Sequence, residues 1–188
     1  MKLPSGNLRV LILGSGGREH ALAWKISRSP LVSDVFVAPG NGGTARYATQ
    51  VEVNLADHKA VMALVKTHGI HLTLVGPEGP LCDGIVDSFM AKGLPIFGPT
   101  RKAAHLEGSK IFAKEVMNHV GVPTANHRIF RRLDRALASI EGMAFPSVIK
   151  EDGLASGKGV TIARTFADAE TAFRNALRTD PKRSGFQP

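Results

Sequence analysis

The chain has 188 residues, of which 43% are apolar and 6% aromatic, and its formal net charge is +8. This composition excludes a disordered chain, and no apolar run approaches the roughly 18 residues needed to span a bilayer. Residues 1–125 carry 13 Lys/Arg against 9 Asp/Glu, and residues 126–188 carry 11 against 7, so each part has an excess of four positive charges. This even spread argues against nucleic-acid binding and fits a general affinity for phosphorylated metabolites. The single cysteine, Cys82, indicates a reducing compartment, and the chain is expected to be soluble and cytoplasmic.

The first hundred residues alternate short apolar strands with helices. The expected strands are Leu8–Leu13, Asp34–Ala38, Leu72–Val75 and Leu94–Phe97. The expected helices are Arg18–Arg28, Asp57–Thr67 with Asp57 as its cap, and Cys82–Lys92. Helices that follow buried strands through short crossovers predict an α/β fold with a doubly wound parallel sheet. A longer helical stretch over residues 100–120 is expected to break near Gly108.

The pattern changes at Gly121-Val-Pro123, which predicts a domain boundary there. The expected domains are a substrate-binding α/β domain over residues 1–122 and a smaller α+β unit over residues 123–188. In the second domain, strands are expected at residues 127–130, 145–150 and 160–164. Its helices are expected at residues 133–140 and 167–177.

The loop after the first strand is glycine-rich and contains Gly14, Ser15, Gly16 and Gly17. Without Cβ atoms the backbone can approach an anion closely, and the first amides of the following helix point at it. Arg18 can pair with a phosphate in a forked geometry. His20 is either a further ligand or an ordinary helix residue, and a tight turn without a ligand remains the alternative for the whole loop.

Two further strand ends carry glycine and polar residues. They are Pro39, Gly40 and Asn41 after the second strand, and Gly76, Pro77 and Glu78 after the third. Loops at the carboxyl ends of neighbouring parallel strands converge on one crevice. Glu78 can accept hydrogen bonds from ribose hydroxyls or from an amine there, or it can be a solvated loop carboxylate.

A dinucleotide site is the main alternative for the first loop, and two features weaken it. The dinucleotide fingerprint needs a third glycine where this chain has Glu19, and it needs an acidic residue at the end of the second strand. That strand ends in Ala38-Pro39-Gly40. A dinucleotide oxidoreductase is therefore the weaker hypothesis.

A second glycine-rich loop connects two expected strands. Its residues are Gly153, Leu154, Ala155, Ser156, Gly157, Lys158 and Gly159. It is not a Walker A motif, because it leads into a strand and lacks the Ser/Thr that follows the lysine. We expect a hairpin flap that closes over a triphosphate, with Lys150 at its root; an exposed basic hairpin is the alternative.

Two other pairs of residues are candidate ligands. Lys110 and Lys114 lie four residues apart on one helix face, and they either line the nucleotide site or form a solvated face. His68 and His71 have a ligand-like interval, but Gly69 interrupts the helix that would align them, so a metal site is not expected.

Together these segments resemble the glycinamide ribonucleotide synthetase (phosphoribosylamine–glycine ligase) family. The resemblance extends to about Leu177 and is carried by six blocks in order, namely residues 13–24, 38–44, 75–81, 97–100, 106–110 and 149–160. It implies an ATP-dependent carbon–nitrogen ligase of purine biosynthesis, with a pre-ATP-grasp domain followed by an ATP-grasp lid subdomain. In this family ATP phosphorylates glycine, and the amine of 5-phosphoribosylamine attacks the glycyl phosphate to give glycinamide ribonucleotide, ADP and phosphate.

The resemblance also assigns the candidate residues to substrates. It implies that Gly14, Ser15, Gly16, Gly17, Arg18, Glu19, His20, Pro39, Gly40 and Asn41 face the phosphoribosyl substrate, and Gly76, Pro77 and Glu78 join them in the same crevice. It implies that Lys110, Lys150 and the Gly153–Gly159 loop face ATP. No catalytic residue and no metal ligand is expected within this chain.

The chain also departs from the family pattern. Glu151 stands where a small residue is usual, and residues 180–188 do not resemble the expected continuation. Family members are more than twice as long, and the Mg²⁺ ligands are expected in the part that lies outside these 188 residues. We therefore expect that the 188 residues alone do not catalyse ligation and that a partner chain can supply the rest. A non-catalytic phosphoribosyl- or nucleotide-binding module is the alternative.

Overall fold

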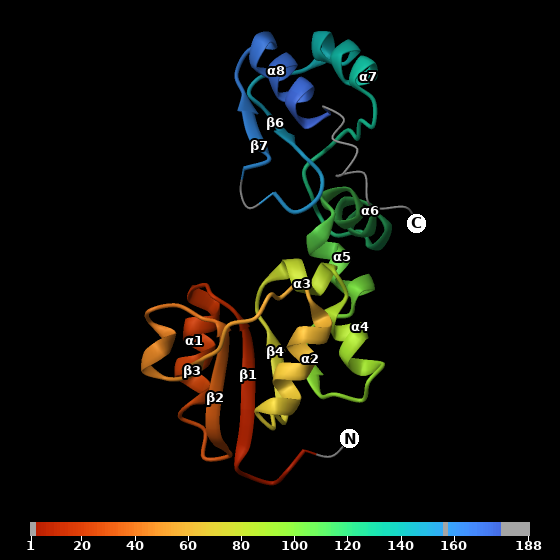
Figure 1. Ribbon diagram of the computed structural model, residues 1–188. Coiled ribbons are helices and arrows are strands. Elements are labelled where there is room, and N and C mark those ends of the chain that lie inside the picture. The colour runs from red at the N-terminus through yellow and green to blue at the C-terminus, as the bar shows by residue number, and fades with distance from the viewer. Residues whose placement is uncertain (1–2, 156–157, 178–188) are drawn as a thin grey trace. The chain divides into compact units, whose positions relative to one another are not determined.

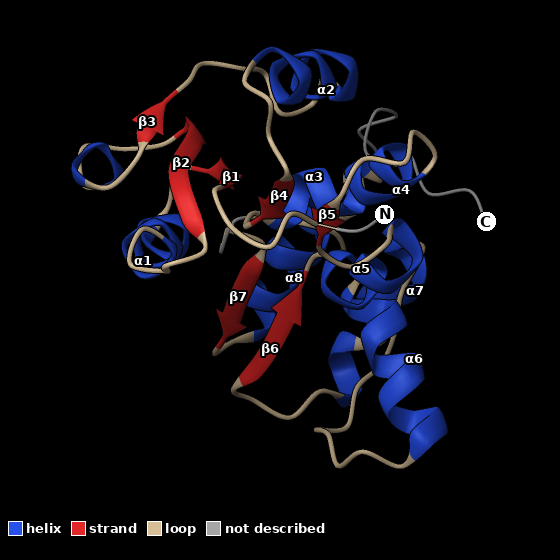
Figure 2. Cartoon of the chain, turned by 90° about the horizontal axis from the view of Figure 1, so that it is seen from below, coloured by secondary structure: helices blue, strands red, loops and turns tan. Residues whose placement is uncertain are grey.

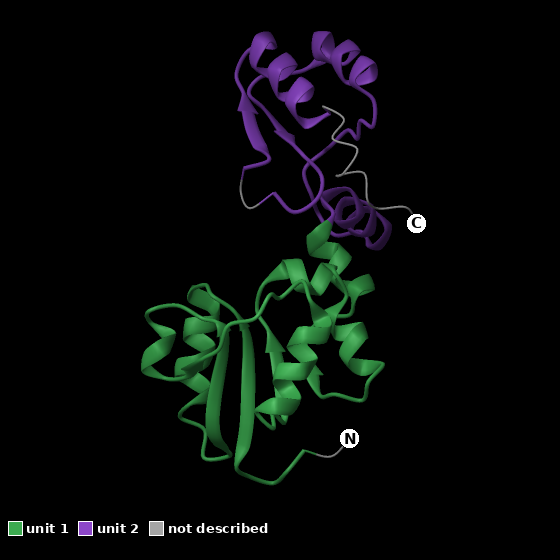
Figure 3. Cartoon of the chain, in the orientation of Figure 1, with its two compact units in different colours: residues 1–108 green, residues 109–188 purple. Residues whose placement is uncertain are grey.

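The computed structural model describes residues 3–155 and 158–177. It divides into two compact units, Met1–Gly108 and Ser109–Pro188 (Figure 3). The two units are described separately below.

The described part of the first unit is built on a five-stranded parallel sheet with the strand order β3-β2-β1-β4-β5 (Figure 1). The strands are β1 (Leu8–Gly14), β2 (Val32–Pro39), β3 (Thr49–Gln50), β4 (Leu72–Val75) and β5 (Ile96–Phe97). The chain first adds strands on one side of β1 and then on the other, so the sheet is doubly wound, as predicted. The order reverses between β1 and β4, which is where open parallel sheets bind ligands.

Helices cover both faces of this sheet (Figure 2). The helices of the first unit are α1 (Gly17–Ile26), η1 (Thr44–Arg46), α2 (His58–Thr67), α3 (Glu78–Cys82), α4 (Ile85–Met90) and α5 (Arg101–Gly108). Alternate residues of β1 point to opposite faces, so Val10 and Ile12 pack with Ala23 of α1. Leu11 and Leu13 pack with residues of α2, α4 and α5 in a second core.

Two expectations for this unit need correction. The helix predicted over Cys82–Lys92 is shorter and corresponds to α4 alone, because Gly84 adopts a left-handed conformation with φ +85° immediately before it. Cys82 instead ends α3, a short helix that was not predicted. The crossover from β2 to α2 also contains η1 and β3, which were not predicted. Elements of two or three residues carry too little periodicity to be recognised in sequence.

The second unit pairs a small antiparallel sheet with helices. Its elements are α6 (Lys110–Val120), α7 (Leu133–Ala138), η2 (Ile140–Gly142), β6 (Ser147–Lys150), β7 (Val160–Ala163) and α8 (Phe166–Ala176). Strands β6 and β7 pair antiparallel, with Lys150 opposite Val160. Ile149 and Ala163 pack with Ala169, Ala172 and Phe173 of α8, and this cluster is the core of the unit.

The strand expected at residues 127–130 is wrong, because the described chain has no regular structure between α6 and α7. Phe130 instead packs edge-on against Phe173, with 5.5 Å between the ring centroids.

The two compact units divide between α5 and α6, whereas the domain boundary expected from the sequence lies after residue 122. The first turn of α6 is hydrogen-bonded to the loop after β6, which explains why α6 groups with the second unit.

Within the described residues, no helix combines the length and the apolar character that crossing a membrane requires.

Candidate functional site

The ends of three strands bring the predicted substrate loops together. Leu13 of β1 pairs with Ala38 of β2 on one side and with Val75 of β4 on the other. The Gly40 amide donates to the Gly14 carbonyl and the Gly76 amide donates to the Leu13 carbonyl, each at 3.1 Å. The loops after β1, β2 and β4 therefore begin side by side at one edge of the sheet.

Glu19 occupies the space that the glycines leave open. Its side chain is only 4% exposed, and its Oε2 accepts a hydrogen bond of 2.6 Å from the Gly16 amide. A Cβ on Gly76 would lie 1.8 Å from Glu19 Oε1, and a Cβ on Gly14 would lie 2.6 Å from its Cδ. These glycines therefore make room for a carboxylate of the chain itself, which the sequence analysis did not anticipate.

This placement changes how the loop can hold an anion. The Gly16 amide, expected to face the substrate, already has the Glu19 carboxylate as its acceptor. The first amides of a helix have no partner within the helix, and those of Gly17 and Arg18 belong to this class in α1. Both residues are exposed. An anion at this edge would therefore be held by the Gly17 and Arg18 amides rather than by Gly16.

Asn41 joins the loops after β1 and β2. Its Nδ2 donates to the Ser15 carbonyl at 2.8 Å and to the Gly16 carbonyl at 3.3 Å. Its Oδ1 accepts from the amides of Gly43 at 2.8 Å and Thr44 at 3.1 Å. The donors and the acceptor of the side-chain amide are thus used inside the chain, so Asn41 holds the two loops together.

Arg18 joins the loops after β1 and β4. Its guanidinium donates to the Gly76 carbonyl and lies 4.0 Å from Glu78 Oε2. The Arg18 side chain remains 65% exposed and that of Glu78 46%. Both side chains are therefore accessible to solvent where these two loops meet.

His20 packs within the chain. Its ring lies 5.8 Å from that of Tyr47, and a Cβ on Gly43 would come within 2.5 Å of its Cε1. The absence of a side chain at Gly43 therefore accommodates the imidazole. This supports the reading of His20 as a packed helix residue over that of a direct ligand.

The second glycine-rich loop forms a hairpin between β6 and β7. The Glu151 amide donates to the Gly159 carbonyl and the Lys158 amide to the Ala155 carbonyl, each at 2.8 Å. A Cβ on Gly159 would lie 2.7 Å from the Ala155 Cβ and 3.1 Å from the Glu151 Cβ, so the turn requires glycine there. Lys150 and Lys158 are exposed. Ser156 and Gly157 of the expected ATP loop lie outside the described residues, as do residues 180–188.

The two lysines of α6 have different roles in the structure. Lys110 Nζ donates to the Gly153 carbonyl at 2.7 Å, which places its ammonium at the root of the hairpin. Lys114 Nζ donates to Thr124 Oγ1 at 2.5 Å and to the Ala125 carbonyl at 3.0 Å, so it holds the segment after α6. The structure therefore separates two lysines for which the sequence left both readings open.

The contacts of Asp152 with the two residues that flank Lys110 were not predicted from the sequence. Asp152 accepts hydrogen bonds from Ser109 Oγ and from the Ile111 amide. Ser109 could have been recognised as a helix cap, because a serine immediately before a helical pattern is a common start signal. Asp152 has no such signal, since its partners lie 43 and 41 residues away.

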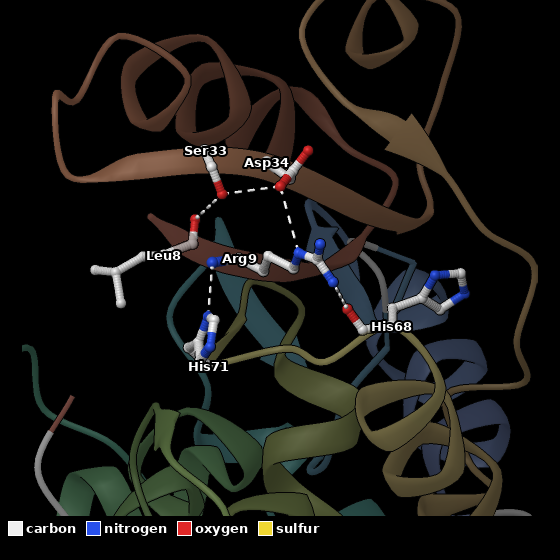
Figure 4. Close-up of polar contacts among 6 residues, drawn as sticks. All are labelled: Leu8, Arg9, Ser33, Asp34, His68 and His71. Carbon is white, nitrogen blue, oxygen red and sulfur yellow. Dashed lines mark hydrogen bonds and ion pairs between the residues drawn. The ribbon is translucent and has the colours of Figure 1, made fainter. Parts of the chain in front are cut away.

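His68 and His71 make separate contacts within the chain. His71 Nδ1 accepts a hydrogen bond of 3.0 Å from the Arg9 amide (Figure 4). The centroid of the His68 ring lies 4.9 Å from that of the Phe36 ring. Arg9 also donates to the His68 carbonyl at 3.2 Å and lies 3.4 Å from Asp34 Oδ2. Within residues 3–155 and 158–177, no group of three or more His, Cys, Asp and Glu side chains is placed to hold a metal ion.

Comparisons with known proteins agree with this geometry. The model of the phosphoribosylglycinamide synthetase N domain matches residues 8–107, and that of the ATP-grasp (A) domain of the same enzyme matches residues 108–185. The phosphoribosylamine–glycine ligase of Xanthomonas axonopodis is 52% identical over 172 residues, which cover 90% of this chain and 40% of that protein. The Escherichia coli O6:H1 ligase is 49% identical with the same coverage.

Solved structures give the same result. The phosphoribosylamine–glycine ligase of Thermotoga maritima is 32% identical, with a TM-score of 0.70 over 90% of this chain and 40% of that one. The ADP complex of an N5-carboxyaminoimidazole ribonucleotide synthetase has a TM-score of 0.72 over 94% of this chain and 46% of that one; at 20% identity it shows the shared fold alone. The chain thus spans about 40% of the length of the curated relatives that it matches. It belongs to the phosphoribosylglycinamide synthetase family.

Proposed function

We propose that this chain contributes the phosphoribosyl site and part of the ATP site of a phosphoribosylamine–glycine ligase. The observation that carries the proposal is the convergence of the three loops after β1, β2 and β4, where Arg18 and the first amides of α1 lie at the sheet's reversal point. A helix N-terminus with an adjacent arginine suits a phosphomonoester. Glu78 adds an acceptor for ribose hydroxyls or for the amine.

The second unit suits the triphosphate. Lys110 is fixed at the hairpin root, and the exposed Lys150 and Lys158 lie on the strand end and the loop. Gly153, with φ +86°, and Gly159 let the backbone turn tightly between these lysines. Three positively charged ammonium groups around a glycine loop are complementary to the negative charge of the ATP triphosphate. Bound ATP would supply the phosphoryl group that activates the glycine carboxylate. The described residues do not offer a ligand set for magnesium, because they contain no cluster of three or more His, Cys, Asp or Glu side chains placed to hold a metal ion.

The chain's own residues act by binding and orienting the reactants. The loops of the first unit would fix the phosphate and ribose, and so position the amine nitrogen for attack on the activated carbonyl carbon. The lysines would neutralise phosphate charge, which is the main requirement of phosphoryl transfer. In the complete ligation the carboxylate takes the terminal phosphoryl group from ATP, the amine then attacks the carbonyl, and phosphate leaves.

The phosphoribosyl site can be tested by calorimetric titration of the 188-residue chain with ribose 5-phosphate. We expect binding of ribose 5-phosphate but not of ribose, because the phosphate supplies the charge that the site recognises. Arg18→Ala should weaken binding at least tenfold, about 1.4 kcal/mol. Arg28→Ala is the matched control, because Arg28 lies just beyond the other end of the same helix, over Trp24.

Two results of this titration would contradict the proposal: equal binding of ribose and ribose 5-phosphate, or equal effects of the two arginine variants.

A measurement of phosphate release then distinguishes a ligase from a non-catalytic binding module. We expect none from the 188 residues alone. A chimera that continues this chain with the remainder of the Escherichia coli relative should release phosphate only with ATP, glycine and phosphoribosylamine together.

A further inference from the structure

We infer that Asp152 is a positioning residue, which locks the root of the β6–β7 hairpin onto the start of α6 and thereby sets where Lys110 meets the nucleotide. The inference rests on the proposed function for its ligand, but its structural part stands on contacts within the second unit. Asp152 is neither a glycine of the loop nor one of the lysines, so the proposed function does not by itself give it a role.

The contact, called the lock below, consists of hydrogen bonds between residues 109–111 at the start of α6 and residues 152–153 of the hairpin. Ser109 Oγ donates to the Asp152 carboxylate, with its two oxygens at 3.0 and 3.2 Å. The Ile111 amide donates to Asp152 Oδ1 at 3.2 Å, and Lys110 Nζ donates to the Gly153 carbonyl at 2.7 Å. Three consecutive residues at the start of α6 thus bind two consecutive residues of the hairpin.

The helix start makes these bonds favourable. The Ser109 hydroxyl accepts from the Phe112 amide at 3.1 Å, and Asp152 accepts from the Ile111 amide. Two first-turn amides that α6 itself cannot satisfy thereby gain acceptors. The Asp152 charge also lies at the positive end of the helix dipole. An anionic ligand is therefore not needed at this helix start, because the chain supplies its own carboxylate.

The lock has a direct consequence for Lys110. An ammonium group has three N–H donors, and the bond to Gly153 directs one of them. This leaves capacity for two further acceptors, such as phosphate oxygens. Without Asp152 the hairpin root would lose its fixed distance from α6, and the lysine would have to be ordered when ATP binds. Ordering on binding costs affinity.

A matched pair of aspartates provides the test. Asp168 also accepts two backbone amides at a helix start, those of Arg164 at 2.9 Å and Thr165 at 3.0 Å, but it caps α8. Asp152→Ala and Asp168→Ala are both expected to lower the melting temperature. Only Asp152→Ala should raise the Kd for ATP at least tenfold, while Asp168→Ala changes it less than twofold. Asp152→Asn, which keeps one acceptor, should fall between wild type and Asp152→Ala, and it replaces that variant if Asp152→Ala fails to fold.

Hydrogen exchange without nucleotide separates the lock from the proposed function. Asp152→Ala should speed exchange of the Lys158 amide, which lies in the hairpin, and Asp168→Ala should not. If the wild-type chain binds no ATP, the proposed ATP site is contradicted, and the exchange result still decides whether Asp152 holds the hairpin. Equal effects of the two aspartates on ATP binding, or unchanged Lys158 exchange in Asp152→Ala, would overturn the inference.

Discussion

At the scale of single residues, Glu19 explains the glycines of the first motif. A strand followed by Gly14, Gly16 and Gly17 suggests a cradle for phosphate, but the carboxylate of Glu19 fills part of that cradle. A carboxylate that accepts a backbone amide at a helix start stabilises the turn. The Glu19 side chain therefore fills part of the space at this loop, and under the proposed function an anion would be held by the amides of Gly17 and Arg18.

The fit between Glu19 and Gly76 predicts that alanine is tolerated very differently at Gly76, in the loop after β4, and at Gly79, in α3. Gly76→Ala should destabilise the first unit by about 1–3 kcal/mol, because the added methyl would displace a buried carboxylate. Gly79→Ala is the control: nothing lies within 4 Å of its Cβ position, so the helical alanine should stabilise by up to about 1 kcal/mol. Urea unfolding followed by circular dichroism measures both, and equal stability of the two variants would refute this packing.

At the scale of elements, local signals predicted most of the fold. The apolar runs located β1, β2 and β4, and Asp57 is the cap of α2, where its Oδ1 accepts from the Lys59 and Ala60 amides at 3.0 Å. The predictions failed where the outcome depends on distant partners. Residues 127–130 have a strand-like pattern, but they pair with no strand in the described part of the chain. The position of the Glu19 side chain depends on how β1 and β4 align.

The same distinction applies to the candidate site. The convergence of the three loops could be predicted, because each follows an apolar strand and the carboxyl ends of parallel strands meet at one edge. The internal roles of Asn41 and Asp152 could not, since each bonds to a segment that is remote in sequence. Hydrogen-bond partners across a fold are set by tertiary packing, which local patterns do not encode.

The cap of α8 predicts an acid-dependent loss of stability. Hydrogen bonds from the Arg164 amide, and then from Thr165, lower the pKa of Asp168 below its ordinary value of 3.8. A depressed pKa in the folded state stabilises the fold above the unfolded pKa, and this contribution is lost as the pH falls through the folded pKa. The stability advantage of wild type over Asp168→Asn should thus be constant at neutral pH and shrink below about pH 3.8. Urea midpoints measured from pH 7 to pH 2 test this, and a gap that stays constant down to pH 2 would rule it out.

At the scale of the whole molecule, the proposed function assigns a different kind of anion site to each compact unit. The first unit offers a helix start and Arg18 at the reversal point of a doubly wound sheet. The second offers lysines around a glycine hairpin. The Xanthomonas axonopodis relative extends well beyond the part that this chain matches, which is 40% of its length.

The most direct test is an amide chemical-shift titration of the chain with ribose 5-phosphate. We expect the amide resonances of Gly17 and Arg18 to shift most. The Gly16 amide, which donates to Glu19, should remain protected from hydrogen exchange. Shifts centred instead on Arg9 and His71, at the opposite ends of the strands, or no saturable shift at all, would contradict a phosphoribosyl site at the carboxyl ends of β1, β2 and β4.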